Sequence, residues 1–357
     1  MKKHIYYTGL LLLLSFVIGS CTEEEKPEGT PTVPVQKDQE EEPYTSHYYY
    51  SFEAVRQLSA TDFGLKDGKF TPGPAYLKGD TLFVANIQSE TLSLELYDRT
   101  NNRHLTSLKS WKYKEAEQKF PEKIEAIAAS GNRIYLANKS SQIDVFDINT
   151  LEFITRIGDG NWGETKNQMM HSHAMVITPD GNIIVRTKKN LLVYQEVDVT
   201  PENYQKVPFY CRSNGDGMDA NNKFRSHQMV QDSTGIIYLA DFGQFGNKKI
   251  QAIDTALIQK GDKITLIDTE KTLALDFNPC GIALYEDKMI VSAQNGSLSL
   301  YDRTKESWGS SFKSVKGFTF KKPEKLLTDK NSFWISDQNA NVLVEVRIYK
   351  NEIREYD

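Results

Sequence analysis

The stretch that decides the fold is Ile134-Tyr135-Leu136-Ala137-Asn138, an apolar strand that ends in a short polar residue. Consecutive apolar positions are typical of a strand that is buried on both faces. Similar stretches recur along the chain at intervals of roughly fifty residues, the mark of a repeat architecture. The other five are Leu82-Phe83-Val84-Ala85-Asn86, Ile183-Ile184-Val185-Arg186-Thr187, Ile237-Tyr238-Leu239-Ala240-Asp241, Met289-Ile290-Val291-Ser292-Ala293 and Phe333-Trp334-Ile335-Ser336-Asp337.

Short turn signals and further strands surround each of these six stretches. The turns are Gly79-Asp80, Gly131-Asn132, Asp180-Gly181, Thr234-Gly235, Glu286-Asp287 and Lys330-Asn331. Gly, Asn and Asp suit hairpin turns because they tolerate positive φ. A short apolar strand precedes each turn, an alternating strand such as 142–147 follows, and a fourth, such as 152–157, completes the unit. The pattern predicts an all-β fold, a six-bladed β-propeller of four-stranded antiparallel blades.

The two ends of the repeat region indicate how the ring closes. Residues 47–59 are rich in strand-forming residues but too few for a seventh blade. We expect this N-terminal strand to pair at the outside of the last blade, which would remove an exposed sheet edge. The C-terminal stretch 352–356 could compete for that place, and the sequence leaves the choice open.

The first twenty residues have the pattern of a signal peptide. Lys2 and Lys3 precede an apolar run of residues 5–18, and Gly19 and Ser20 come just before Cys21. The run is short for a membrane-spanning helix, which needs about 20 residues. The sequence Ile18-Gly19-Ser20-Cys21 resembles a bacterial lipobox, in which the cysteine is acylated and becomes the mature N-terminus. This implies that residues 1–20 are a signal peptide and that Cys21 carries a lipid such as palmitate.

An acidic linker follows the cysteine. Residues 22–46 contain eight acidic and two basic residues, with Pro, Thr and Gln between them. Such a composition buries too little apolar surface to offset the entropy of ordering, so we expect residues 21–46 to be a disordered tether. Residues 47–357 then form the propeller. The run Thr22-Glu23-Glu24-Glu25 resembles the acidic tag of Bacteroidota lipoproteins that are displayed on the outer face of the outer membrane.

The repeat also resembles a known group of propellers. A strand ending in Val or Leu, Ala and Asn or Asp, followed by a strand ending in Phe or Tyr and Asp, is similar to the NHL and YVTN repeats. With the lipobox and the acidic tag, the chain resembles the six-bladed, TolB-like propeller lipoproteins of Bacteroidota over residues 70–350. The resemblance is informative about the fold and says little about function, because this architecture hosts binders, scaffolds and enzymes.

Charge excludes one class of partner. The chain has 43 basic and 48 acidic residues and a net charge of −5. Since the acidic excess lies mostly in the linker, the propeller body is nearly neutral. A nucleic-acid binder needs a clustered excess of Lys and Arg, so we expect no nucleic-acid partner.

Histidines mark the face on which we expect a ligand. Counting strand directions places the start of each first strand and the end of each second strand on the same face. Three of the six histidines, His171, His173 and His227, lie at equivalent starts, together with Arg225. Neutral imidazole is a common metal ligand, so His173 and His227 are candidates for binding a divalent metal. The alternative is that each histidine bonds a neighbouring blade and seals the channel, because matching positions elsewhere hold Pro279 and Pro323.

Aromatic and acidic residues add candidates on the same face. Trp111 and Trp162 follow the fourth strands of successive blades, where exposed rings could stack on sugars, although burial between blades is the alternative. Asp241 ends a second strand, and Phe245 lies in the loop that follows. Asp241, like Asn86, Asn138 and Asp337, could bind a ligand or instead hold its own turn. The long polar loop 212–222 is a further candidate, because loops on a rigid scaffold often carry binding residues.

Two cysteines remain in the propeller. Cys211 lies at the end of the third blade and Cys280 at the start of the fifth, too far apart in the fold for a disulfide. We expect two unpaired, buried thiols.

Two functional hypotheses follow. The first is a non-catalytic, cell-surface lipoprotein of the outer membrane that binds a ligand or a partner protein through the propeller face. The resemblance implies an accessory role beside a TonB-dependent transporter, with a glycan, a peptide or a cobalamin-like small molecule as ligand. The alternative is an enzyme, a metal-dependent lyase or hydrolase with His173 and His227 at the channel and Asp241 or Glu125 as base. The chain contains no linear catalytic motif, and no catalytic residue is assigned.

Overall fold

The six repeats form six sheets in the larger of two compact units. The computed structural model describes residues 44–213, 228–242 and 248–356. The larger unit, His47–Ile353, contains the sheets, and the smaller comprises Met1–Ser46 with Arg354–Asp357. The described part of the chain contains no helix that is both long enough and apolar enough to cross a membrane.

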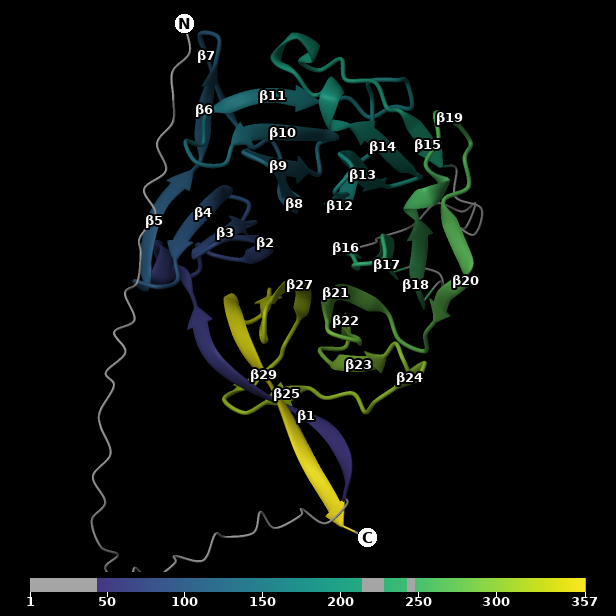
Figure 1. Ribbon diagram of the computed structural model, residues 1–357. Helices are drawn as coiled ribbons and strands as arrows, with labels where there is room; N and C mark the ends of the chain where they lie inside the picture. The colour runs from purple at the N-terminus through teal and green to yellow at the C-terminus, as the bar shows by residue number, and fades with distance from the viewer. Residues whose placement is uncertain (1–43, 214–227, 243–247, 357) are drawn as a thin grey trace, which may run out of the picture. The chain divides into compact units, whose positions relative to one another are not determined.

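Each sheet is one blade of a propeller, and Figure 1 shows the blades arranged in a ring around a centre. Blades are numbered 1 to 6 by their inner strands, which are β2 (Pro72–Lys78), β8 (Ile124–Ser130), β12 (Ser172–Ile177), β16 (Gln228–Gln231), β21 (Pro279–Tyr285) and β27 (Pro323–Asp329). The second strands are β3 (Thr81–Asn86), β9 (Arg133–Asn138), β13 (Asn182–Thr187), β17 (Ile236–Phe242), β22 (Lys288–Ala293) and β28 (Ser332–Asp337). The predicted six-bladed fold is confirmed.

The remaining elements complete the blades. The third strands are β4 (Ser93–Asp98), β10 (Gln142–Asp147), β14 (Leu191–Gln195), β18 (Lys248–Asp254), β23 (Leu298–Asp302) and β29 (Val342–Tyr356). The outer strands are β5 (Arg103–Leu108), β11 (Phe153–Ile157), β15 (Cys211–Ser213), β20 (Ile267–Ala274), β24 (Ser307–Trp308) and β1 (Tyr44–Leu58). Smaller elements are β6 (Ser110–Tyr113), β7 (Ala116–Lys119), β19 (Gly261–Asp262), β25 (Ser314–Val315), β26 (Phe318–Thr319), and the 3-10 helices η1 (Ala60–Phe63), η2 (Glu196–Asp198), η3 (Pro201–Asn203) and η4 (Thr255–Leu257).

The turns between first and second strands have the predicted backbone. One residue in each of the six turns has a positive φ, namely Gly79, Gly131, Gly181, Gly235, Glu286 and Lys330. Glycine adopts this conformation without the steric cost that a β-carbon brings. The local sequence therefore sets where each hairpin reverses.

The second strands are apolar because both faces of each blade are buried. In β9, Ile134 and Leu136 pack in the cluster between blades 1 and 2, whereas Tyr135 and Ala137 pack between blades 2 and 3. Alternate side chains of a strand point to opposite faces, so a blade between two neighbours needs an apolar residue at each position. Six apolar clusters fill the six boundaries between adjacent blades. The core of this unit thus consists of apolar interfaces between adjacent blades, arranged in a ring.

The N-terminal strand closes the ring. The last sheet has the order β1-β29-β28-β27, so β1 is the outer strand of blade 6. The stretch 352–356 belongs to β29, the third strand of that blade, and does not compete for the outer place. Across β1, Phe52 stacks on Phe312 with centroids 5.0 Å apart and meets Phe333 edge to face at 6.1 Å. The expected N-terminal closure is confirmed.

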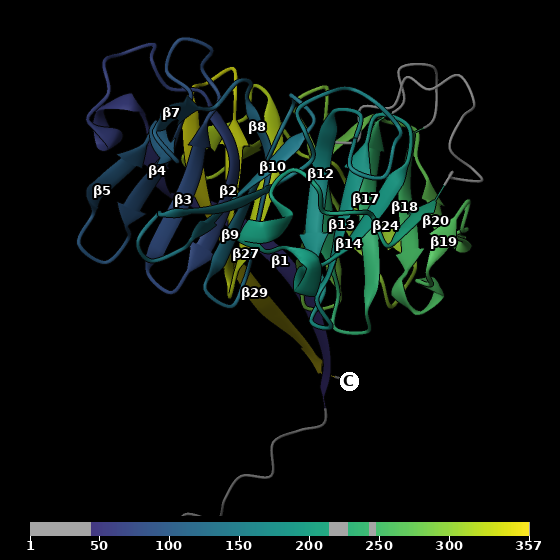
Figure 2. The same cartoon turned by 90° about the horizontal axis from the view of Figure 1, so that it is seen from above.

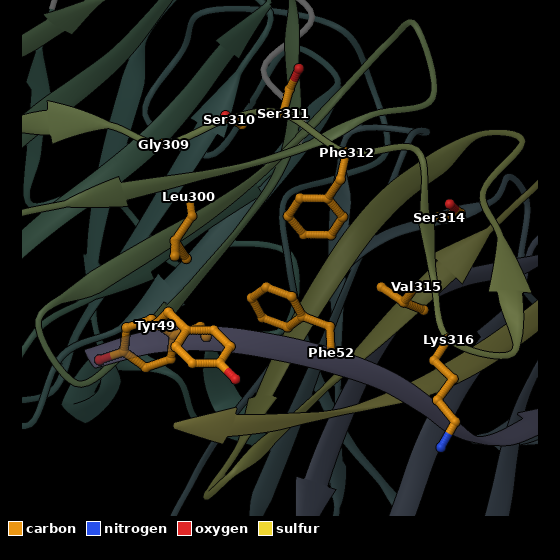
Figure 3. Close-up of a pocket in the computed structure, with 11 residues that line it drawn as sticks. Tyr49, Phe52, Leu300, Gly309, Ser310, Ser311, Phe312, Ser314, Val315 and Lys316 are labelled. Atoms are coloured by element: carbon orange, nitrogen blue, oxygen red, sulfur yellow. The ribbon is translucent and has the colours of Figure 1, made fainter. Parts of the chain in front are cut away.

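An open groove lies along the closing strand. Its volume is about 780 Å³, and Figure 3 shows Phe52 and Phe312 facing each other within it, with Tyr49, Leu300 and Val315 around them. The backbone of β1 is hydrogen-bonded to the segment that forms the other wall, because the Ala54 amide donates to the Lys316 carbonyl at 2.8 Å. The Lys316 ammonium pairs with Glu53 at 2.8 Å. The groove is therefore part of the closure, where blade 5 meets β1.

Phe52→Ala should destabilise the protein by about 1–3 kcal/mol, because it removes both ring contacts of the closing strand. The matched control is Tyr48→Ala on the same strand, whose ring is 57% exposed; its loss should change stability by no more than about 0.5 kcal/mol. Chemical denaturation of both variants measures the difference. Equal losses in the two variants would contradict the role given to Phe52.

Candidate functional site

The inner strands all begin on one face, which we call the top face. Each first strand starts opposite the end of its second strand, as in the pairs Ile124 with Asn138 and Ser172 with Thr187. The same backbone hydrogen bond recurs there, for example from the Lys139 amide to the Lys123 carbonyl at 3.1 Å. Figure 2 shows the strands running between the two faces of the ring. The expected common face for these positions is confirmed.

Trp162 and His171 form an exposed aromatic surface on this face, which we call the shelf. Their rings are stacked with centroids 5.4 Å apart and planes 20° from parallel. Trp162 is 56% exposed, a large value for an indole ring. The Lys188 ammonium lies 4.6 Å from the centre of the Trp162 ring, a cation–π contact. The shelf is the exposed aromatic surface that the sequence predicted for Trp162.

Two residues hold the loop that carries Trp162. Gly158 has a φ of +83°, and a β-carbon there would meet the Ser141 carbonyl oxygen at 2.7 Å, so a larger residue would force the loop away. Met169 is completely buried and forms a backbone bridge with Trp162. The indole is therefore exposed on a loop that is anchored at both sides.

The surroundings of His171 hold its pKa below the ordinary value of a histidine. Burial lowers its pKa, and the nearby ammonium groups of Lys139 and Lys188 lower it further, whereas Glu122 and Glu125 act in the opposite direction more weakly. The ring of His173 lies 6.3 Å from His171, edge to face. A neutral imidazole can both donate and accept a hydrogen bond, which suits contact with hydroxyl groups.

Charged side chains fill the centre of the top face in pairs. Glu125 binds the Lys123 ammonium at 2.9 Å, and Glu324 binds Lys322 at 2.8 Å. Lys325 lies close to both carboxylates; burial lowers its pKa, although Glu125 and Glu324 oppose that shift. Burial raises the pKa of Glu125, but Lys123 and Lys325 together outweigh it and hold the pKa below the ordinary value. These charges balance one another inside the protein.

A small cavity lies among the inner strands behind these charges. It measures about 50 Å³ and is lined by residues that include Glu125, Met175 and Lys325. The Gln228 side chain accepts hydrogen bonds from the amides of Leu326 at 2.8 Å and Ile282 at 3.2 Å, and its amide donates to the Leu326 carbonyl. Gln228 thus ties blade 4 to blades 5 and 6 at the axis. The space suits a water molecule or two, so a larger ligand must stay on the face.

Trp111 does not lie on the face. It is 7% exposed and packs between blades 1 and 2, stacked on Phe153 at 5.8 Å and tilted against Phe120 at 5.0 Å. The expectation of an exposed ring is wrong for this residue, because β6 and β7 form a hairpin that turns the indole into the core. The similar spacing of the two tryptophans did not reveal this difference.

Asp241 is also inaccessible. It is completely buried, and neither carboxylate oxygen has a hydrogen-bond partner within the part of the chain that the structure describes. Burial raises its pKa to about 6, while Arg186 and Lys249 act to lower it. A ligand on the surface does not reach this carboxylate. The related residues Asn86 and Asp337 hold their turns, since Asn86 donates to the Thr91 carbonyl at 3.0 Å and Asp337 accepts from the Lys322 amide at 2.9 Å.

Three predicted site residues lie outside the described residues, namely Arg225, His227 and Phe245, as does Cys21. The pairing of His173 with His227 at a metal therefore stays a prediction. Among the residues that the structure describes, no group of three or more His, Cys, Asp or Glu is arranged to hold a metal ion. Cys211 and Cys280 are free and buried, as predicted, and burial raises the pKa of both thiols.

A second polar cluster has the composition of a nucleophilic triad but not its geometry. In blade 1, His104 Nε2 lies 2.9 Å from Glu95 and 3.3 Å from the Ser107 hydroxyl. A triad needs one ring nitrogen for the nucleophile and the other for the acid. Here a single nitrogen meets both, and the Ser107 hydroxyl donates directly to Glu95 at 2.5 Å. The cluster joins β4 to β5 of blade 1 and does not have the arrangement of a triad.

Sequence reasoning missed two lysines beside the shelf. Lys139 and Lys188 directly follow the second strands of blades 2 and 3, at matching positions of the repeat. Aligning the residue after each second strand would have found them. Their proximity to His171, which arises from the contact between the two blades, has no signal in the local sequence.

Comparisons with known proteins show the fold and leave the function open. No family model matches the chain, and no curated protein matches it. A structural genomics protein of unknown function from Bacteroides thetaiotaomicron VPI-5482 has a similar structure, with a TM-score of 0.56 and 13% identity over 85% of this chain and 77% of that one. A protein of unknown function from Bacteroides caccae gives a TM-score of 0.47 and 10% identity over 69% of this chain and 78% of that one.

Asp241→Asn should change how stability depends on pH. The carboxyl of Asp241 has a pKa of about 6 in the folded protein and about 4 in an unfolded chain. Between these values the folded state binds more protons, so this group's contribution to stability falls as the pH rises. Relative to Asp241→Asn, the wild type should lose roughly 1–3 kcal/mol of unfolding free energy from about pH 4 to about pH 6. Denaturation at several pH values measures this, and parallel profiles would refute the raised pKa.

Proposed function

We propose that the propeller binds a carbohydrate on its top face, with the Trp162–His171 shelf as the main contact. The half-exposed, anchored indole is the observation that carries the proposal. A flat aromatic ring offers apolar area to the C–H face of a sugar, and a neutral imidazole beside it can exchange hydrogen bonds with hydroxyl groups. Small-molecule sites combine such apolar area with a few placed polar groups.

The structure around the shelf supports binding to a preformed surface. The shelf sits at the boundary of blades 2 and 3, over a large apolar cluster. The Ser172 hydroxyl joins the two blades there, donating to the Asn138 carbonyl at 2.7 Å. A ligand that docks on a preformed surface spares the entropy of ordering it.

The cellular location of the protein is part of the proposal. The N-terminal pattern that resembles a lipobox and an acidic export tag supports a lipid-anchored protein on the outer face of the outer membrane. There a sugar-binding propeller would act as an accessory to a TonB-dependent transporter, holding its ligand close to the channel. Linker and lipid would keep the propeller at the membrane while leaving its face open to ligands.

Trp162→Ala should abolish glycan binding or weaken it at least about fivefold, because stacking on the ring contributes roughly 1 kcal/mol or more. The test is a screen of the purified wild type against neutral and acidic glycans, followed by affinity measurements on the variant. Tyr48→Ala, which removes a ring of similar exposure in a different blade, is the matched control. A wild type that binds no glycan, or a variant with unchanged affinity and unchanged folding, would overturn the proposal.

Cys21→Ala should abolish incorporation of an alkyne-tagged palmitate in cells, because acylation needs that thiol. Cys280→Ala, which removes a buried thiol of the propeller, should leave the label in place. Protease added to intact cells should cleave the wild-type protein if it is displayed outside. Labelling that persists in Cys21→Ala would refute the lipid anchor, and protection from the protease would refute surface display.

A further inference from the structure

We propose that the ligand of the shelf is an acidic sugar whose carboxylate binds between Lys139 and Lys188. This inference rests on the proposed function, because it assigns a chemical class to the ligand of the same shelf. The Lys188 ammonium lies over the indole, on which His171 is stacked. Lys139 directly follows Asn138, whose carbonyl accepts a hydrogen bond from the hydroxyl of Ser172, the residue after His171. The two lysines come from neighbouring blades, at the ends of β9 and β13.

The two lysines differ from the other lysines around them. Lys123, Lys189 and Lys322 each form an ion pair with a glutamate, at 2.9, 2.9 and 2.8 Å respectively. Within the described ranges 44–213, 228–242 and 248–356, no carboxylate pairs with Lys139 or Lys188. The protein thus balances the neighbouring cations and leaves these two available to an anion from outside.

The charge around the shelf differs from that of the whole propeller. Lys139 and Lys188 bring two ammonium groups to the boundary of blades 2 and 3, whereas the propeller body as a whole is nearly neutral. A positive site on a nearly neutral protein selects ligands by their own charge.

The position of Lys188 favours an anion over a neutral sugar. Its ammonium lies over the indole, 4.6 Å from the ring centre. A ring that stacks on that side must displace the ammonium and lose the cation–π contact. A ligand with a carboxylate recovers this loss because the displaced ammonium pairs with it, and a neutral ligand does not.

The size of the channel keeps the sugar at this boundary. The cavity of about 50 Å³ at the axis is too small for a sugar ring. Its lysine, Lys325, already lies between Glu125 and Glu324. Among the described residues, neither the space nor an unbalanced charge at the centre favours an acidic ligand, and Lys139 and Lys188 are the cations that we expect to pair with its carboxylate.

The test compares the binding of each acidic sugar with that of its uncharged methyl ester. Oligosaccharides of galacturonic acid and of glucuronic acid are titrated into the purified protein beside their methyl esters, which keep the ring and remove the charge. At low ionic strength, at least one acid should bind roughly tenfold more tightly than its ester. Added salt should reduce this preference, since the ion pairs are exposed.

The variants separate the charge from the stacking surface. Lys139→Gln with Lys188→Gln should bring the acid to the affinity of its ester, while the ester binds as before or better. Lys189→Gln is the matched control, because the adjacent Lys189 is already paired with Glu164; it should keep the preference. Trp162→Ala should weaken both members of a pair.

The outcomes distinguish this inference from the proposed function. Esters that bind as tightly as acids, with both lost in Trp162→Ala, would overturn the acidic ligand and leave sugar binding in place. A preference that survives the double lysine variant would overturn the assignment of Lys139 and Lys188. If no acid or ester binds, this inference falls, and the neutral glycans of the wider screen decide whether the proposed function falls with it.

Discussion

The pairing of β1 with β29 is the contact on which the rest of the propeller depends. Each blade is apolar on both faces, so every blade needs a neighbour on each side. A ring satisfies this need only when its last blade is complete and reaches the first. The end of β1 and the segment after it continue that contact, since Leu58, Phe63 and Phe70 pack with Trp334 of blade 6 and Leu82 of blade 1. One strand thereby joins the last blade to the first.

The parts of this fold that could be predicted are those with a local cause. Two-sided burial requires the apolar run in Ile134–Asn138, and positive φ requires the Gly131 type of turn, so both leave a readable pattern. Because this weak local pattern recurs along the chain, the number of repeats predicts the number of blades. The closure of the ring could be predicted in the same way. The N-terminal strand is too short to form a seventh blade, and the exposed edge of the last blade needs a strand to pair with it.

The site was less predictable because exposure is set by contacts between blades. Trp111 and Trp162 have similar places in the sequence repeat, yet a hairpin turns the first into the core, and an anchored loop leaves the second exposed. Asp241 is as completely buried as its counterparts Asn86 and Asp337. It differs from them because its carboxylate has no hydrogen-bond partner among the described residues and lies near Arg186. Lys139 and Lys188 were missed because only the contact between two blades brings them together beside the shelf.

The distribution of charge explains why a ligand would bind away from the central axis of the propeller. Inner-strand positions hold Glu125, Gln228 and Lys325, and these side chains satisfy one another or the backbone of neighbouring strands. A buried charge must be paired to be tolerated, so the centre is occupied by the protein's own pairs. At the exposed boundary of blades 2 and 3, solvent stabilises an unpaired ammonium at little cost. An available positive charge can therefore persist beside the exposed indole of Trp162, where a rigid boundary between two blades holds both in place.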